Sequence, residues 1–310
     1  MNDTIVILDY GSQYTQLIAR KIRECNVHSI ILPFDSSNES ISKYNVKGFI
    51  LSGGPSSVYD ENAPQLLNSI FDYNVPILGI CYGFQLLVNH YNGVVENSKK
   101  AEYGHSNINI KSDSKLFLDI DLVSNVWMSH GDKVKKNPEG WTITSTSDND
   151  IISSSEDYMK NIYGVQFHPE VYHTKDGLKI INNFLFKICY AKDNWTPDNF
   201  VNHTIEKIRN IVGDDKVICA ISGGVDSTVV GTLMKKAIGS KAICIFIDHG
   251  LLRKDEAKEV IDIYNNNLKL DVKLYDLSEQ FLSKLKDVND PEKKRKIIGN
   301  KFIEEFEKIS

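Results

Sequence analysis

The sequence predicts an α/β protein of two domains, each built around a mostly parallel sheet. Short apolar runs of strand type alternate with amphipathic helical patterns from the first residues onward, as in consecutive βαβ units. Two of these runs break into glycine-rich turns that open helices. A polar stretch with a proline separates them, so we expect a first domain at residues 1–192, a linker at 193–200 and a second domain at 201–310.

The first domain is expected to begin with βαβ units. Strands are predicted at residues 4–8, 29–32, 48–51, 76–80 and 163–167. A helix with one apolar face follows the first strand. Its apolar residues are Leu17, Ile18, Ile22 and Cys25. The alternation shortens between residues 107 and 153, which predicts an antiparallel insertion, and a helix over residues 177–190 closes the domain.

The strand at residues 76–80 runs into Gly-x-Cys-x-Gly, centred on Cys81, and then into a helical pattern. This is the thiol form of a nucleophile elbow, in which glycines permit a sharp strand-to-helix turn. The helix N-terminus favours a thiolate and offers free N–H donors to an oxyanion. The alternative interpretation is an ordinary buried cysteine at a strand end.

A histidine and a glutamate follow the predicted strand at residues 163–167, in the sequence His168-Pro169-Glu170. His168 can act as the base for Cys81, and Glu170 can orient the imidazole and fix its tautomer. The alternative for His168 is a turn residue before a proline. His130, in Trp-Met-Ser-His-Gly-Asp, is a second candidate base, and the family resemblance described next favours His168.

The elbow and His-Pro-Glu, in this order, resemble the class I glutamine amidotransferases, whose Cys-His-Glu triad hydrolyses the glutamine side-chain amide. The resemblance implies a flavodoxin-like open mixed sheet for the first domain. It also implies that the Gly-Gly-Pro loop after the third strand supplies an oxyanion N–H from Gly54, with a second N–H from Tyr82. Gln85, one turn into the helix, either contacts the substrate or is an exposed helix residue.

The second domain opens with a strand at residues 217–221 and a helix that Gly239 ends. A loop rich in glycine and hydroxyl groups joins the two, which is typical of a phosphate cradle at a helix N-terminus. It lacks the Gly-Lys-Ser/Thr ending of kinase and GTPase loops. It resembles the PP-loop of ATP pyrophosphatases, the alternative being a glycine-rich connection. The loop consists of Ser222, Gly223, Gly224, Val225, Asp226, Ser227 and Thr228.

Two further segments narrow the resemblance. The strand at residues 242–247 ends in Asp-His-Gly-Leu-Leu-Arg, and Asp-Pro-Glu-Lys-Lys-Arg starts at Asp290. With the two glycine-rich turns, in this order, they resemble the family of glutamine-hydrolysing GMP synthases over essentially the whole chain. This implies an adenine nucleotide α-hydrolase-like second domain that uses ATP and Mg²⁺ to adenylylate xanthosine monophosphate.

The same resemblance suggests roles for individual residues in that domain. Asp226 is a candidate Mg²⁺ ligand. Arg253 is a candidate contact to xanthosine monophosphate, because its planar fork suits a phosphate. Three basic residues are expected on a lid that closes over the nucleotide, although a basic run of this kind is usually a solvated helix face. These residues are Lys293, Lys294 and Arg295.

Members of this family continue past the lid into a dimerisation domain, and they form homodimers. From this we expect weak glutamine hydrolysis, little GMP formation and a monomer for a chain that stops at Ser310. An alternative remains open: a glutaminase subunit that donates ammonia, with the PP-loop domain sensing nucleotides. A non-catalytic relic is disfavoured by the intact triad and loop.

Composition excludes several classes of protein. The net charge of −5 argues against nucleic-acid or membrane binding. No signal-type segment and no apolar run of membrane-spanning length is present in the sequence. The cysteines are odd in number and form no Cys-x-x-Cys pair, so they predict free thiols in a reducing, cytoplasmic compartment. They are Cys25, Cys81, Cys189, Cys219 and Cys244.

Overall fold

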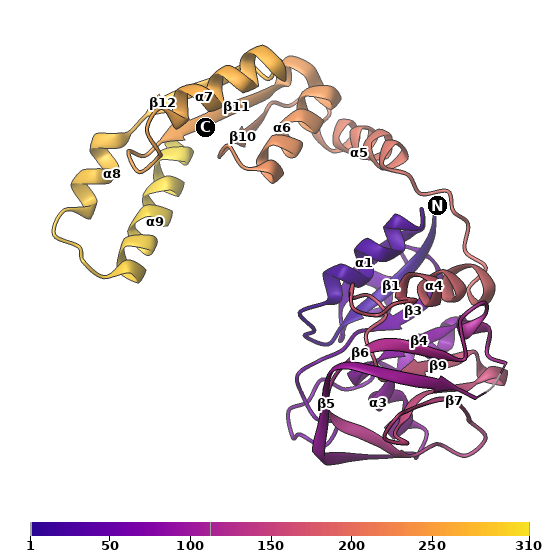
Figure 1. The fold of residues 1–310 in the computed structure, drawn as a ribbon. Coiled ribbons are helices and arrows are strands. Elements are labelled where there is room, and N and C mark those ends of the chain that lie inside the picture. Colours follow the sequence, from indigo (N-terminus) through magenta and orange to yellow (C-terminus); the bar gives the residue numbers. More distant parts are fainter. Residues whose placement is uncertain (1, 112, 310) are drawn as a thin grey trace. The chain divides into compact units, whose positions relative to one another are not determined.

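The computed structural model describes residues 2–111 and 113–309, and at residues 98–101 the backbone alone. Met1, Ser112 and Ser310 fall within the predicted domains and lie outside the described residues. The chain divides into two compact units, Met1–Thr196 and Pro197–Ser310 (Figure 1). This division lies inside the stretch expected to be a linker. No helix in the described ranges has the length and apolar character needed to cross a bilayer.

The first unit is a mixed sheet covered by helices, and its nine strands, counted over the described residues, follow the order β2-β1-β3-β4-β9-β8-β7-β5-β6. The strands are β1 Asp3–Asp9, β2 His28–Pro33, β3 Asn45–Leu51, β4 Ile77–Ile80, β5 Val94–Ile110, β6 Val123–Lys136, β7 Thr142–Ser147, β8 Ile152–Asp157 and β9 Ile162–Val165. The helices are α1 Thr15–Glu24, α2 Asn38–Ile41, α3 Tyr82–His90 and α4 Gly177–Asn182. This arrangement confirms the α/β class with an open mixed sheet.

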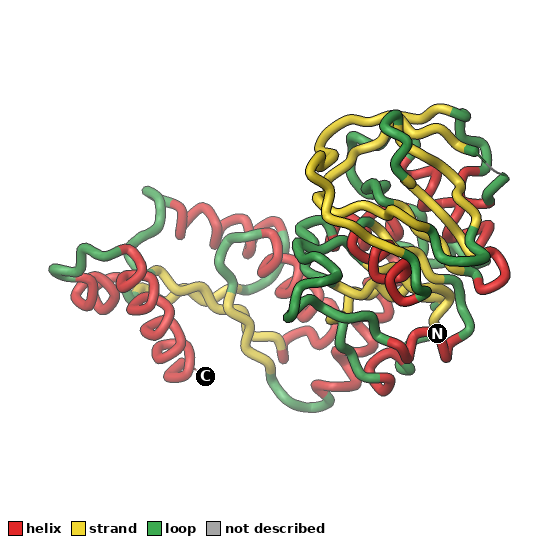
Figure 2. Tube along the Cα trace, turned by 90° about the horizontal axis from the view of Figure 1, so that it is seen from below, coloured by secondary structure: helices red, strands yellow, loops and turns green. Residues whose placement is uncertain are grey.

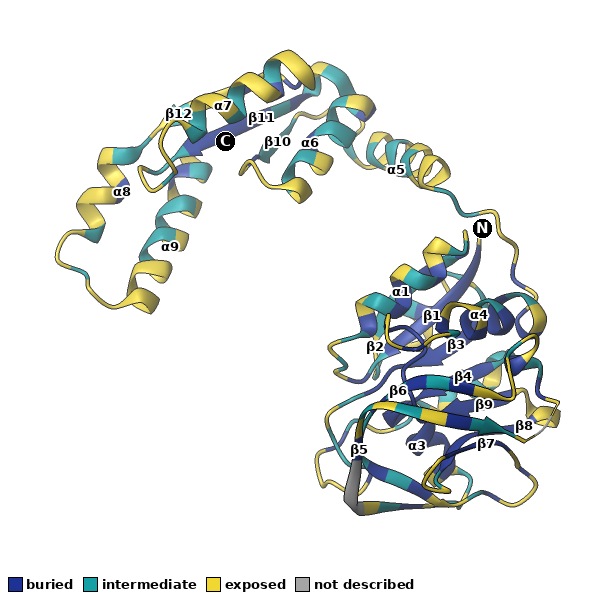
Figure 3. Cartoon of the chain, in the orientation of Figure 1, coloured by how far each residue is buried: buried dark blue, intermediate teal, exposed yellow. Residues whose placement is uncertain are grey.

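Strands β2, β1, β3, β4 and β9 run parallel and carry helices on both faces. Their near-continuous apolar sequences follow from this, because strands covered on both faces bury every side chain. On β1, Ile5 and Ile7 pack on the face of α1 and α4, whereas Val6 and Leu8 pack on the face of α3. Figure 3 shows β1, β4 and β9 as largely buried.

The antiparallel part begins earlier than the sequence predicts. The expected start was residue 107, but β5 begins at Val94 and pairs with β6 as a long edge hairpin. The described side chains of this hairpin are largely polar, as is common where an edge must resist pairing with another chain. Without a clear apolar alternation, its first half gives little strand signal in the sequence.

The helix predicted over residues 177–190 is present but not uniform. It is regular as α4 and then continues as a π-helical segment over Asn183–Ile188. The buried Asn183 side chain donates to the carbonyls of Leu116 and Leu118, 3.1 and 2.8 Å away. The wider turn accompanies these two bonds, which tie the helix to the segment between β5 and β6.

The second unit contains a smaller parallel sheet of order β10-β11-β12, within the part of the chain described. Figure 2 marks the strands of both sheets. The strands of the second unit are β10 Val217–Ala220, β11 Ala242–Asp248 and β12 Val272–Asp276. Its helices are α5 Pro197–Val212, α6 Val225–Ile238, α7 Glu256–Asp262, α8 Ser278–Leu285 and α9 Pro291–Ile309. Gly239 takes a φ of 60° at the end of α6, as the sequence predicts.

Candidate active site

Cys81 lies at the turn between β4 and α3 and caps the helix N-terminus. It takes a φ of 52° and a ψ of −104°, which an L-residue rarely adopts, so the elbow is strained at the cysteine itself. The flanking glycines provide space rather than unusual torsions. A side-chain carbon at Gly79 would lie 2.6 Å from the Gly83 carbonyl carbon, and one at Gly83 would meet the Leu51 backbone.

The structure brings Cys81, His168 and Glu170 together. Strands β4 and β9 are parallel neighbours, so the residues that follow them share one edge of the sheet. The Cys81 amide donates to the Val165 carbonyl across this pair at 2.8 Å. His168 Nδ1 lies 2.7 Å from Glu170 Oε1, and the imidazole also interacts with the Cys81 side chain.

The surroundings of His168 favour its charged form. Burial opposes a charged imidazole, but the Glu170 carboxylate and the Cys81 sulfur outweigh it and raise the pKa of His168 well above its ordinary value. The Tyr14 ring meets the imidazole edge-on with centroids 5.3 Å apart, and the Thr174 hydroxyl donates to the His168 carbonyl at 2.6 Å. A fixed imidazolium can stabilise negative charge on the sulfur and later donate a proton.

A cleft of about 340 Å³ opens beside the sulfur, at the lower end of the range of small-ligand sites. It is lined by Gly11, Ser12, Gln13, Tyr14, Gly54, Pro55, Cys81, Ser129 and His168. A side-chain carbon at Gly53 would lie 3.2 Å from His168 Cε1, so glycine lets this loop approach the ring. The amide of Tyr82, the first residue of α3, has no partner within its own helix. Gly54, the other predicted oxyanion donor, lines the cleft together with Cys81.

Gln85 is buried, not exposed, and it lies behind the cleft rather than in its lining. Its amide donates to the Asp132 carbonyl at 2.9 Å and to the Gln166 side-chain oxygen at 3.2 Å. Gln166 in turn places its own amide 3.6 Å from the Cys81 sulfur. The sequence analysis did not single out Gln166. Its position two residues before His168, as the one polar side chain in the strand predicted at residues 163–167, was the available signal.

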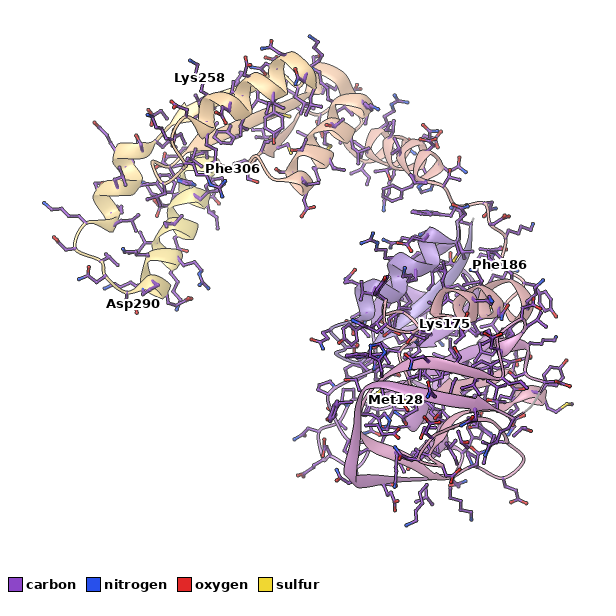
Figure 4. The ribbon with its side chains drawn as sticks, viewed as in Figure 1. Met128, Lys175, Phe186, Lys258, Asp290 and Phe306 are labelled. Carbon is purple, nitrogen blue, oxygen red and sulfur yellow. The ribbon has the colours of Figure 1, made fainter. Side chains whose placement is uncertain are left out.

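His130 occupies a different place from His168. Its Nε2 lies 3.3 Å from Glu102 Oε2, and its Nδ1 is 2.9 Å from the Asp132 carbonyl oxygen. It is buried outside the cleft, on the same strand as the core residue Met128, which is labelled in Figure 4. Its neighbour Ser129 reaches the site through its carbonyl, which accepts from the Cys81 thiol at 3.6 Å. The His130 imidazole therefore supports β6 and does not face the sulfur.

The phosphate-loop candidates form a turn between β10 and α6. Gly223 takes a φ of 83°, which favours glycine, and Gly224 caps α6. The Ser222 and Ser227 hydroxyls lie 3.1 Å apart, and both Ser227 and Thr228 donate to the Gly224 carbonyl. These bonds hold the loop with the N-terminus of α6 open, which is the arrangement that binds phosphate groups. Thr228 is also tied to the Tyr264 hydroxyl at 2.7 Å.

Asp226 lies exposed in the first turn of α6, beside this loop. One carboxylate next to a phosphate cradle suits Mg²⁺, which commonly takes one or two carboxylates together with substrate phosphates. No cluster of three metal-ligating side chains occurs in the described ranges. The residues present therefore fit a metal that is held jointly with a bound nucleotide.

The remaining predicted residues are not assembled with the loop. Arg253 follows β11 on the same sheet edge as the loop, and its amide donates to Glu256 at 2.7 Å. Lys293, Lys294 and Arg295 lie in the first turns of α9, which Asp290 caps (Figure 4). Arg295 pairs with Glu292 on its own helix at 3.1 Å. Among described residues, no hydrogen bond or ion pair joins the three basic residues to the phosphate loop.

Comparison with known proteins divides the chain into two parts that correspond to the two structural units. The glutamine amidotransferase class-I family matches residues 6–188, and the NAD synthase family matches residues 198–302. A solved structure from Thermoplasma acidophilum, described as one subunit of a GMP synthase, is 30% identical, with a TM-score of 0.55. The match covers 61% of this chain and 95% of the Thermoplasma chain.

Two curated relatives match nearly the whole chain. A glutamine-hydrolyzing GMP synthase of Brachyspira hyodysenteriae is 48% identical over 304 residues, which is 98% of this chain and 59% of the relative. The corresponding protein of Bacillus mycoides is 49% identical over 306 residues, 99% of this chain and 60% of the relative. The chain thus spans about three fifths of the length of these relatives.

Proposed function

The chain belongs to the class I glutamine amidotransferase family, and from this premise we propose that it hydrolyses glutamine at Cys81. We further propose that the ammonia serves an ATP-dependent amination of xanthosine monophosphate to GMP in the second unit. The observation that carries the proposal is the meeting of Cys81, His168 and Glu170 at a strained elbow. The phosphate loop on a separate sheet and the two GMP synthase relatives support the second step.

In the proposed hydrolysis, the Cys81 sulfur attacks the carboxamide carbon of glutamine. The amides of Gly54 and Tyr82 hold the oxyanion of the tetrahedral intermediate. His168 gives its proton to the nitrogen, and ammonia leaves a thioester on Cys81. His168 then takes a proton from water, which attacks the thioester, and glutamate and the Cys81 thiolate are released beside the re-protonated imidazole. Glu170 keeps the imidazole oriented through both proton transfers.

In the proposed amination, the loop at residues 222–228 holds the pyrophosphate end of ATP at the N-terminus of α6. Mg²⁺ bound with Asp226 would neutralise phosphate charge there. The oxygen at position 2 of xanthosine monophosphate takes the AMP group and pyrophosphate leaves. Ammonia then replaces AMP at that carbon. Arg253 is the proposed contact to the substrate phosphate, and the basic residues of α9 would shield the adenylate from water.

Separate assays of the two products test this proposal. The chain is incubated with glutamine, ATP, Mg²⁺ and xanthosine monophosphate, and glutamate and GMP are measured independently. Glutamate release that is absent in Cys81→Ala supports the hydrolysis, and wild-type release in that variant would overturn it. Replacing glutamine by ammonium and measuring AMP tests the second unit alone. Glutamate without AMP under any condition would favour an ammonia-donating subunit with a nucleotide-sensing module.

A further inference from the structure

Two cysteines lie side by side on the strands that lead into the candidate nucleotide site. Cys219 on β10 is the direct register partner of Cys244 on β11. Residues opposite one another in a parallel pair point to the same face of the sheet, so both thiols lie on one side. Both are free thiols in the structure. Neither has a role in the proposed reactions.

The spacing of the strands suits a bond between the two sulfurs. Neighbouring strands lie about 4.8 Å apart, which is within the range of about 4.4–6.8 Å spanned by the Cα atoms of disulfides. The two thiols are close enough to influence each other's pKa. Side chains alone therefore need to rotate and approach, while the backbone pairing of β10 with β11 stays in place.

The two thiols differ in reactivity. The interaction between the two thiols lowers the pKa of Cys219 and raises the pKa of Cys244. Cys219 is half-buried, whereas Cys244 is fully buried in the core of the unit. Cys219 is thus the more exposed and the more acidic of the two thiols, and Cys244 lies beside it on the neighbouring strand.

We propose that Cys219 and Cys244 form a redox modification site that closes to a disulfide by exchange with a low-molecular-weight disulfide of the glutathione class. The Cys219 thiolate attacks one sulfur of the reagent, forms a mixed disulfide and releases one small thiolate. Cys244 gives up its proton and attacks the Cys219 sulfur, which releases the second small thiolate. Two protein thiols and one small disulfide become one protein disulfide and two small thiols.

The Cys219–Cys244 disulfide would lower the affinity of the loop at residues 222–228 for nucleotide, and this consequence rests on the proposed function. Cys244 packs beneath α6, because a side-chain carbon at Gly231 would lie 3.6 Å from its sulfur. Ile221 packs against the same glycine, because a side-chain carbon at Gly231 would lie 2.9 Å from the Ile221 Cδ1. Ile221 directly precedes Ser222. Drawing the sulfurs together changes the side-chain packing between Cys244, Gly231 and Ile221, directly before the loop. We therefore expect the oxidised chain to bind ATP–Mg²⁺ about tenfold more weakly.

Peptide mapping of the full chain tests the bond itself. The chain is treated with oxidised glutathione and digested with trypsin, which places the two cysteines in separate peptides, 217–235 and 242–253. We expect these peptides to be joined after oxidation and separated again by dithiothreitol. Failure to detect the joined peptides across a range of reagent ratios, in protein whose other thiols react, would overturn the proposal.

Two variants test the order of attack. Cys244→Ala should accumulate the glutathione adduct on Cys219, because no second thiol can displace it. Cys219→Ser should give neither adduct nor bond at this site. Cys25→Ser, in the other unit and also half-buried, is the matched control and should cross-link like the wild type. Adduct formation at Cys244 in the Cys219→Ser variant would contradict the assigned roles.

Calorimetry with ATP–Mg²⁺ separates this proposal from the proposed function. Tenfold weaker binding after oxidation, restored by dithiothreitol and absent in Cys219→Ser, supports the coupling to the loop. Unchanged affinity in chain shown to be cross-linked would overturn that coupling. If the chain forms the disulfide on oxidation but does not bind ATP even when reduced, the redox site is supported and the nucleotide role of the loop is refuted.

Discussion

The elbow at Cys81 and the loop at residues 222–228 share one local plan, a strand followed by a glycine-rich turn and a helix, yet they differ in almost every other respect. Cys81 is 5% exposed and is held among side chains from several strands, whereas Val225 in the other turn is 78% exposed. The strain at the elbow falls on a cysteine, and the positive φ of the loop falls on Gly223.

This difference follows from what each turn is proposed to do. Covalent catalysis requires side chains fixed to within a fraction of an ångström, so the elbow is buried and surrounded by His168, Gln166 and Ser129. Phosphate binding uses backbone N–H groups and the helix dipole, which a short turn provides without neighbours from other strands. The first turn depends on tertiary packing and the second mainly on its local sequence.

The largest expected effect is the loss of the nucleophile at the elbow, and it tests whether the two turns act independently. Cys81→Ala should reduce glutamine hydrolysis by a factor of about 10⁴ or more, because the nucleophile is lost. ATP–Mg²⁺ affinity should stay unchanged, since the loop lies in the other unit. Glutamate release and calorimetry measure the two properties. A comparable loss of nucleotide affinity would show that the two turns do not act independently.

The next effect concerns the charge on His168. Glu170→Gln removes the carboxylate that raises the pKa of His168, so we expect hydrolysis to fall about 100-fold and its alkaline limb to move to lower pH. The raised pKa implies stabilisation that is complete below about pH 6.5 and is lost as the pH rises through the folded-state value. Urea unfolding across pH should show this dependence in the wild type and less of it in Glu170→Gln. A pH profile identical to that of the wild type would refute this role.

On the side of the loop, Asp226→Ala should weaken ATP–Mg²⁺ binding about tenfold while the first unit folds and hydrolyses glutamine normally. Asp198→Ala is the matched control, because Asp198 is also an exposed acid in the first turn of a helix. Calorimetry measures the affinities. Equal effects of the two substitutions would indicate a general loss of charge rather than a metal ligand.

The smallest expected effect concerns Gln166, whose side-chain amide lies next to the Cys81 sulfur at the elbow. Gln166→Leu should slow both glutamine hydrolysis and alkylation of Cys81 by iodoacetamide about fivefold, because the sulfur loses an N–H neighbour. Gln65→Leu, at an exposed position in the same unit, should change neither rate. Peptide mass analysis follows the alkylation at Cys81 itself. Slower hydrolysis with unchanged alkylation would place Gln166 in substrate binding instead.

The sequence predicted the features that depend on neighbouring residues. The strand–turn–helix pattern at Cys81, the turn after β10 and the end of α6 at Gly239 all appear where the residue pattern placed them. The α/β class followed from the alternation of apolar runs. Local steric and hydrogen-bonding preferences decide such features, and they are encoded in a few consecutive residues.

Contacts between distant segments were decided by the tertiary structure. The approach of Gln85 to Gln166, the pairing of His130 with Glu102 and the register of Cys219 with Cys244 each join different elements. Such contacts depend on strand order and register, which the sequence of either partner alone does not specify. The early start of β5 is not apparent in the sequence for a related reason, because an edge hairpin is stabilised by its partner strand and not by an apolar pattern of its own.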